Sequence, residues 1–105
     1  MIDFWQAAYD HGVELVVSGN DHLYERFGPQ TPDGRADPSR GIRQFVVGTG
    51  GRSHYRFGAI RPNSEARNDD AFGVLKLSLH PGAYGWRFVP ASGATFSDSV
   101  GAPCH

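Results

Sequence analysis

The stretch that decides the fold is residues 13–26, which read VELVVSGNDHLYER. Its first part, residues 13–18, is apolar, β-branched and nearly unbroken, which predicts a buried strand. Its second part opens with Gly19, followed by Asn, Asp and His within three residues. Imidazole nitrogens and carboxylate or amide oxygens are common metal ligands. The stretch therefore predicts a strand that delivers a candidate metal site to the edge of a sheet.

The rest of the chain is organised around this strand. Apolar residues recur at helical spacing before it, and Gly12 is suited to end that helix. In chain order, the patterns predict a helix over residues 2–11, a strand over 13–18, a loop over 19–41, a strand over 42–47, a polar loop over 52–71, and strands over 72–79 and 84–89 joined by a hairpin turn at 80–83. Residues 90–105 are predicted to be an exposed tail.

These elements define an α+β chain with one N-terminal helix and about four mainly antiparallel strands. A single helix covers only one side of such a sheet, and apolar strand faces need a partner layer. We therefore expect residues 1–105 to be part of a larger layered domain. Tyr84, Trp86 and Phe88 alternate along one strand and are predicted to be core against a layer outside the chain. The alternative is an exposed aromatic strip that binds sugar or peptide.

Composition excludes some classes of partner. The 105 residues carry a net charge of −1, which gives no electrostatic case for nucleic acid or for an anionic membrane. No apolar run approaches the roughly 20 residues of a membrane span, and the first residues lack the layout of a signal peptide. Cys104 is the only cysteine, so we expect either an inert residue in a frayed tail or the partner of a disulfide to an upstream segment.

The candidate site centres on His22. In extended backbone, residues two apart point the same way, so Asn20 and His22 would face one site while Asp21 turns away. Tyr24, Glu25 and Arg26 offer charged and hydroxyl groups suited to orienting ligands from a second shell. The alternative is that His22 is an ordinary polar loop residue.

Two further segments contain groups that could bind an anion. Residues 48–51, Gly-Thr-Gly-Gly, are predicted to be a turn that ends a strand, with a backbone cradle for phosphate as the alternative. Arg52 and His54 follow at alternate spacing and could face an anionic substrate, whereas the alternative is a solvated loop.

The motif at residues 19–26, GNDHLYER, resembles the last metal-binding motif of the calcineurin-like metallophosphoesterases. That motif reads Gly-His-x-His and continues x-Tyr-Glu-Arg in the purple-acid-phosphatase branch. Seven of the eight positions agree, and Asn20 stands where the family has a histidine. Residues 41–51 and 72–89 resemble the strands that follow the motif in that branch, in the same order.

The resemblance implies the C-terminal part of a four-layer α/β/β/α sandwich that hydrolyses phosphate esters with a dinuclear centre of Fe, Zn or Mn. His22 would be a ligand of the first metal, and Asn20 would occupy a ligand position of the second, where its neutral amide binds more weakly. The family's other ligands lie upstream of this motif. We therefore expect the isolated chain to be inactive and to bind no metal stably, with the upstream part of the domain as its partner. An extracellular or periplasmic location is also implied.

Two alternatives to a phosphoesterase belong to other classes of protein. One is a non-catalytic, β-rich interaction or structural module that has lost the metal site. The other is a non-functional remnant that binds no divalent metal and unfolds without a cooperative transition.

Overall fold

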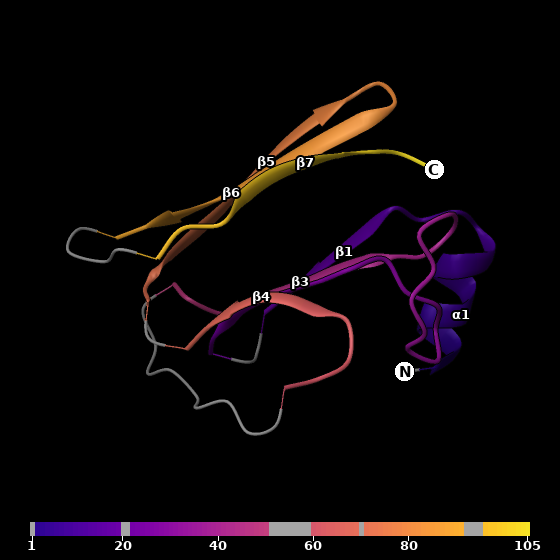
Figure 1. Cartoon of the computed structure of the whole chain (residues 1–105), viewed down its shortest axis with the longest axis horizontal. Coiled ribbons are helices and arrows are strands. Elements are labelled where there is room, and N and C mark those ends of the chain that lie inside the picture. Colours follow the sequence, from indigo (N-terminus) through magenta and orange to yellow (C-terminus); the bar gives the residue numbers. More distant parts are fainter. Residues whose placement is uncertain (1, 20–21, 51–59, 70, 92–95) are drawn as a thin grey trace.

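One helix and two β-sheets of mostly antiparallel strands make up the computed structural model, which describes residues 2–19, 22–50, 60–69, 71–91 and 96–105. The two sheets lie face to face, and the helix lies beside β1 at one end of the lower sheet (Figure 1). The α+β class predicted from the sequence is therefore confirmed. The described residues form seven strands, however, and not the predicted four or so.

Helix α1 spans Ile2–Asp10, as the apolar spacing predicts. Gly12 ends it with a φ of 74°, a left-handed conformation that costs glycine little. The Val13 amide donates to the Ala8 carbonyl at 3.0 Å and so closes the last turn.

The first sheet has the strand order β1-β3-β2-β4, with bounds Leu15–Ser18 for β1, Tyr24–Phe27 for β2, Arg43–Val47 for β3 and Ser64–Asn68 for β4. Strand β1 pairs in parallel with β3, and β2 pairs antiparallel with both β3 and β4. A strand is confirmed within residues 13–18, but the prediction that it is buried was wrong. It is an edge strand with a neighbour on one side only, and Val17 is 45% exposed.

Strands β2 and β4 lie where the sequence predicts loops. Their sequences, YERF and SEARN, are short and polar and show no apolar alternation. They become strands because each pairs with a neighbour that is distant in sequence, and that pairing leaves no local signal.

The second sheet has the order β5-β6-β7, with β5 at Gly73–His80, β6 at Ala83–Pro90 and β7 at Ser99–Pro103. The predicted hairpin turn is confirmed, since His80 pairs with Ala83 and Gly82 has a φ of 77°. The predicted tail was wrong in one respect. Among its described residues, Ser99–Pro103 pairs along β6 as a strand, and Phe96, Ala102 and Cys104 pack against the core, so Cys104 is not in a frayed tail.

The core lies between the two sheets and is built mainly from aromatic side chains. Its buried members are Tyr24, Phe45, Ala71, Tyr84, Trp86 and Phe88. Phe45 meets Trp86 at 5.4 Å between ring centroids, and Tyr24 meets Phe88 at 4.8 Å. The aromatic strip of β6 is therefore core, as predicted, but its partner layer is the chain's own first sheet. The alternative of an exposed aromatic strip is wrong, since Trp86 is 4% exposed.

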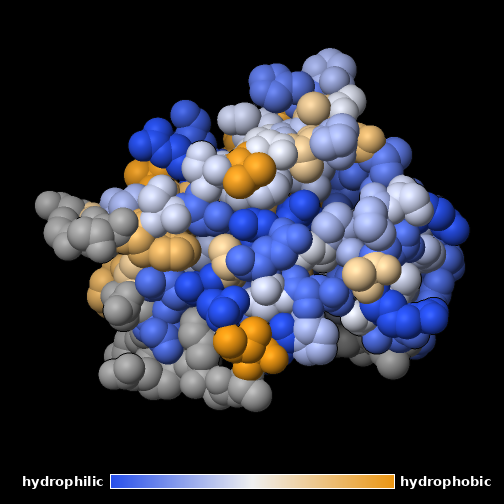
Figure 2. Space-filling model, in the orientation of Figure 1, coloured by the Kyte–Doolittle hydropathy of each residue, from blue (hydrophilic) through white to orange (hydrophobic). Residues whose placement is uncertain are grey.

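The outer surfaces are mixed. A second small cluster, Leu23, Phe27 and Val46, lies on the opposite side of the first sheet from the main core. Apolar side chains reach the face seen in Figure 2 as separate patches in a mostly hydrophilic surface. Among the described residues, no helix is long and apolar enough to cross a membrane.

We expect Phe45→Ala to lower the free energy of unfolding by about 3–5 kcal/mol, because it leaves a cavity between the two sheets. Urea denaturation followed by Trp fluorescence measures this. Phe4→Ala is the matched control, since Phe4 is 53% exposed and its loss should change stability little. Equal effects of the two changes would contradict the placement of the core.

Candidate functional site

One edge of the first sheet collects the residues predicted to carry chemistry. Tyr24, at the start of β2, pairs with Val47 at the end of β3 and with Asn68 at the end of β4. Strand β1 runs parallel to β3, so it ends at the same edge. We call this the His22 edge, and its described members are Gly19, His22, Gly48, Thr49, Gly50, Asn68 and Asp69.

The end of β3 is fixed between the two sheets. The Gly48 amide donates to the Leu23 carbonyl at 3.0 Å. Thr49 is 1% exposed, and its hydroxyl donates to the Gly73 carbonyl at 2.8 Å, while the Gly73 amide donates back to the Thr49 carbonyl at 3.0 Å. This confirms a strand-ending turn as far as Gly50. A phosphate role for the segment stays a prediction.

The predicted ligands are only partly described. His22 is half-buried, and it interacts with at least one neighbouring group. Asn20, Asp21, Arg52 and His54 lie outside the described residues. Within the described ranges, no three His, Cys, Asp or Glu side chains form a group that could hold a metal ion. The topology nevertheless brings Asp69, which the sequence did not single out, to the same edge as His22.

Tyr24, Glu25 and Arg26 alternate across β2, as strand geometry requires. Tyr24 and Arg26 turn into the space between the sheets, where both contact Asp98. Glu25 lies on the other face and accepts a hydrogen bond of 2.6 Å from the Ser64 hydroxyl. The three residues therefore do not share one environment, and their role in orienting ligands stays a prediction.

Arg26 and Asp98 form a charged pair between the sheets. The Arg26 Nε donates to one Asp98 oxygen at 2.8 Å and Nη2 to the other at 3.1 Å, while the Tyr24 hydroxyl donates at 2.6 Å. The Arg26 and Asp98 side chains are only 11% and 10% exposed. Two parallel N–H···O bonds between a guanidinium and a carboxylate give both strength and a fixed geometry.

A second guanidinium, that of Arg43, lies next to the first. Its Nη1 donates to the Phe27 carbonyl at 3.1 Å and to Glu65 at 2.8 Å, and its Nε donates to the Tyr84 hydroxyl at 3.2 Å. Glu65 also pairs with Arg26, so one carboxylate serves both cations. It can do so because the register of β2 and β4 shifts here, which leaves Glu65 as the extra residue of a bulge.

Trp86 packs against both of these cations. The guanidinium carbons of Arg26 and Arg43 lie 5.0 and 4.6 Å from the centre of its ring, within the range of cation–π attraction. The Trp86 ring N–H makes no well-formed hydrogen bond within the described residues. The interior of the sandwich is therefore charged and aromatic on the side near β4, and apolar elsewhere.

Protonation follows from this packing. Burial alone would raise the pKa of Asp98, but hydrogen bonds from Arg26 and Tyr24 outweigh it and hold the pKa below its usual value. Burial and the hydrogen bond to Asp98 raise the pKa of the Tyr24 hydroxyl. Asp98 is thus ionised and Tyr24 neutral at ordinary pH, which keeps the network charge-balanced around Arg26.

Sequence reasoning missed Asp98, Glu65 and Arg43. One signal was present for Asp98, which is the only acidic residue after Asp70. A single carboxylate among Ser, Gly and Ala is unusual for a merely solvated tail. Glu65 and Arg43 gave no comparable signal, because their pairing depends on a bulge and on strand order.

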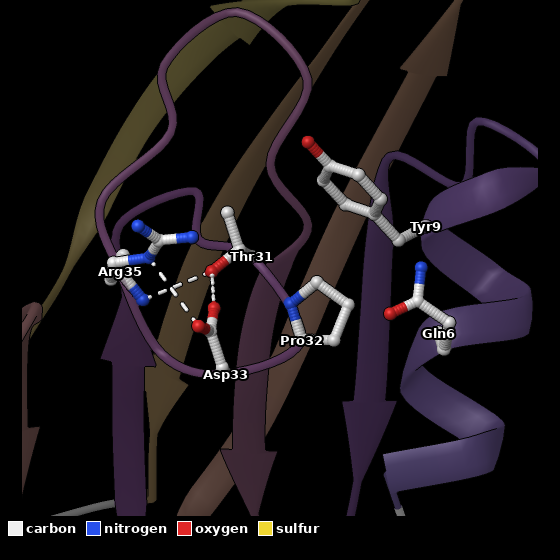
Figure 3. A pocket seen from close by; sticks show the side chains of 6 residues that line it. All are labelled: Gln6, Tyr9, Thr31, Pro32, Asp33 and Arg35. Atoms are coloured by element: carbon white, nitrogen blue, oxygen red, sulfur yellow. Dashed lines mark hydrogen bonds and ion pairs between the residues drawn. The ribbon is translucent and has the colours of Figure 1, made fainter.

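Among the described residues, the two larger of several hollows lie at the opposite end of the first sheet, where β2 ends and β3 begins. One, of about 330 Å³, separates α1 from the loop at residues 31–35, and Figure 3 shows Tyr9 and Gln6 facing Thr31, Asp33 and Arg35 across it. Those loop side chains hydrogen-bond and pair mainly with one another. The other hollow, of about 460 Å³, is lined in part by Arg43, Glu65 and the chain end at His105.

Neither a protein-family model, nor a curated protein, nor a solved structure matches this chain.

We expect Asp98→Asn to destabilise the fold by about 3–5 kcal/mol near neutral pH, because it leaves the buried Arg26 charge without its bidentate partner. Chemical denaturation measures the loss. Arg87→Gln is a control, since Arg87 is an exposed charge on the second sheet. A loss no larger than that of the control would show that the pair contributes nothing to holding the sheets.

The same variant should also change the dependence of stability on pH. The folded pKa of Asp98 is depressed, so its contribution is complete above the unfolded value of about 3.9 and is lost as pH falls through the folded value. Asp33 and Asp37 also have lowered pKa values, so part of the acid dependence should remain in Asp98→Asn. Unfolding curves between pH 2 and pH 6 test this, and identical pH profiles for the two proteins would contradict it.

Proposed function

We propose that this chain is the C-terminal part of a metal-dependent phosphoesterase of the calcineurin-like, purple-acid-phosphatase type. The observation that carries the proposal is the His22 edge. Gly19 and His22, which belong to the motif that resembles the family's last metal-binding motif, follow the end of β1, and Gly48 and Gly50 follow the end of the parallel strand β3. Ligands in layered α/β proteins typically bind beyond the carboxyl ends of parallel strands, so this is the edge at which chemistry is expected.

The described residues supply only part of a metal site. His22 offers a nitrogen and Asp69 a carboxylate, whereas a catalytic zinc-type site takes about three protein ligands and keeps one open position. By themselves they do not fit a dinuclear centre. The proposal keeps Asn20 as a weak ligand position within the chain and assigns the other ligands, and the missing layers of a four-layer sandwich, to protein outside it.

Within this proposal the chain has two tasks. It holds His22 at the edge of a sheet, and it fixes that edge through the Thr49–Gly73 hydrogen bonds and the Arg26–Asp98 pair on the next strand. A ligand must be held to within a fraction of an ångström to be effective, and packed strands do this better than loops. The buried network would thus serve the site indirectly, by fixing β2 immediately after His22.

The alternative, a non-catalytic β-rich module, is favoured by one observation. The two sheets already enclose a core of their own, with Tyr24, Phe45 and Phe88 fully buried. A chain that folds cooperatively alone, and whose preceding sequence holds no family ligand motifs, would support this alternative against the phosphoesterase.

We expect the purified chain to hydrolyse p-nitrophenyl phosphate no faster than buffer with the same metal ions. The complete domain should hydrolyse it, and His22→Ala should reduce that activity by at least about 10–100-fold, the cost typical of losing groups around a metal. His80→Ala is the matched control, because His80 is exposed beside the β5–β6 turn. Turnover by the isolated chain that disappears in His22→Ala would overturn the assignment of missing ligands.

We further expect Asn20→His to tighten metal binding by the complete domain. An imidazole suits zinc or iron better than a neutral amide oxygen, so the second metal should bind at least about tenfold more tightly. Titration with Zn²⁺ followed by calorimetry measures this, with Asn20→Ala as the reference for no ligand at that position. Equal affinities of the wild-type and Asn20→His proteins would show that the position does not face a metal.

A further inference from the structure

The outer face of the second sheet carries two positive charges directly opposite each other. Alternation along β5 and β6 turns Leu75, Leu77 and Trp86 inward, so Lys76 and Arg87 point outward, where both are exposed. They are direct partners in the β5–β6 register. Like charges at opposed positions of a pair are unfavourable, because their Cβ atoms lie only about 4.5–5.5 Å apart.

Nothing acidic on this sheet compensates the pair. Strands β5, β6 and β7 contain no Asp or Glu, and the one carboxylate after Asp70, that of Asp98, is turned inward to Arg26. Ser78, His80 and Ser99 add exposed polar groups to the same face. Val74, 60% exposed, pairs with Val89 on one side of the cations, and Gly85 pairs with Gly101 on the other. We call this surface the basic sheet face.

Helix α1 has the complementary surface. Its exposed residues Asp3, Ala7 and Asp10 follow one another along one side of the helix, and Phe4, 53% exposed, flanks them. The helix contains no basic residue. Trp5, Ala8 and Tyr9 are the partly buried residues of the opposite side. The exposed side is therefore acidic with one large apolar group, and we call it the acidic helix face.

We propose that the acidic helix face of one copy of this chain docks on the basic sheet face of a second copy. Asp3 and Asp10 would meet Lys76 and Arg87, and Phe4 would contact Val74 and Val89. The nine-residue helix is about 13 Å long and about 10 Å wide. Strands β5 and β6 are about 26 Å long, and β7 widens the surface to about 10 Å over about 17 Å of that length. Asp3 and Asp10 are about 10 Å apart along the helix, so the long Lys76 and Arg87 side chains would have to spread from their opposed positions to meet both.

Such a contact joins two different surfaces, so it is heterologous and leads to a ring or to a chain of copies. The weight-average mass of the wild-type chain in sedimentation equilibrium should rise with protein concentration. High salt should weaken the association, because the Debye length falls from about 10 Å at 0.1 M to about 3 Å at 1 M. A wild-type chain that stays monomeric at every concentration overturns the proposal.

Charge reversal provides the decisive test. Variant one carries Lys76→Glu and Arg87→Glu, and variant two carries Asp3→Lys and Asp10→Lys. Each alone should associate at least about tenfold more weakly than wild type, because like charges then face each other across the contact. An equimolar mixture of the two should regain association, since each variant then offers a face of opposite charge to the other.

Arg61→Glu is the control, as Arg61 is exposed and belongs to neither face. Circular dichroism and thermal unfolding establish that each variant keeps the fold. Variants that associate as wild type does, or a mixture that fails to recover, overturn the proposal. In the proposed complete domain an outer helical layer would cover this sheet face, so the association is proposed for the chain by itself. The measurements involve no hydrolysis and therefore test it separately from phosphoesterase activity.

Discussion

The pairing of Arg26 with Asp98 is the interaction on which the rest of this structure depends. It joins β2, in the middle of the first sheet, to the residue that precedes β7 in the second. Tyr24 adds a third hydrogen bond to the same carboxylate, and Trp86 packs against the guanidinium. Two sheets with mainly apolar inner faces could slide over each other at little cost, whereas a bidentate ion pair between them allows one alignment.

A buried ion pair does not by itself make a protein more stable, since the desolvation of both charges can exceed their attraction. Here the two guanidinium groups and two carboxylates balance each other, and Tyr24, Tyr84 and the Phe27 carbonyl satisfy further hydrogen-bonding capacity. We infer that the network acts chiefly on specificity. It sets which face of β2 is inward, and so directs how the chain leaves the strand on its N-terminal side, at His22.

Local patterns were sufficient to predict α1, β1, β3 and the β5–β6 hairpin, because helical spacing, a β-branched run and a Pro-Gly turn are written in consecutive residues. They were insufficient for β2, β4 and β7, whose strands exist through distant partners. The residues of the candidate site also fall into those that local patterns predict and those that they do not. The motif around His22 is visible in sequence, but Asp69 reaches its edge only through strand order, and the bulge at Glu65 has no local signature.

The separation of Arg26 and Asp98 along the chain has a consequence for biosynthesis. Asp98 follows Arg26 by 72 positions, and all of the intervening residues must be made before the pair can form. Contacts so distant in sequence form slowly, since loop closure precedes any gain from packing. On a ribosome, which releases the N-terminal part first, β2 emerges with a cationic side chain whose bidentate partner, Asp98, is translated long after Glu65, its other partner. Until then the second sheet does not cover the inner face of the first, and we expect that face to depend on chaperones for protection.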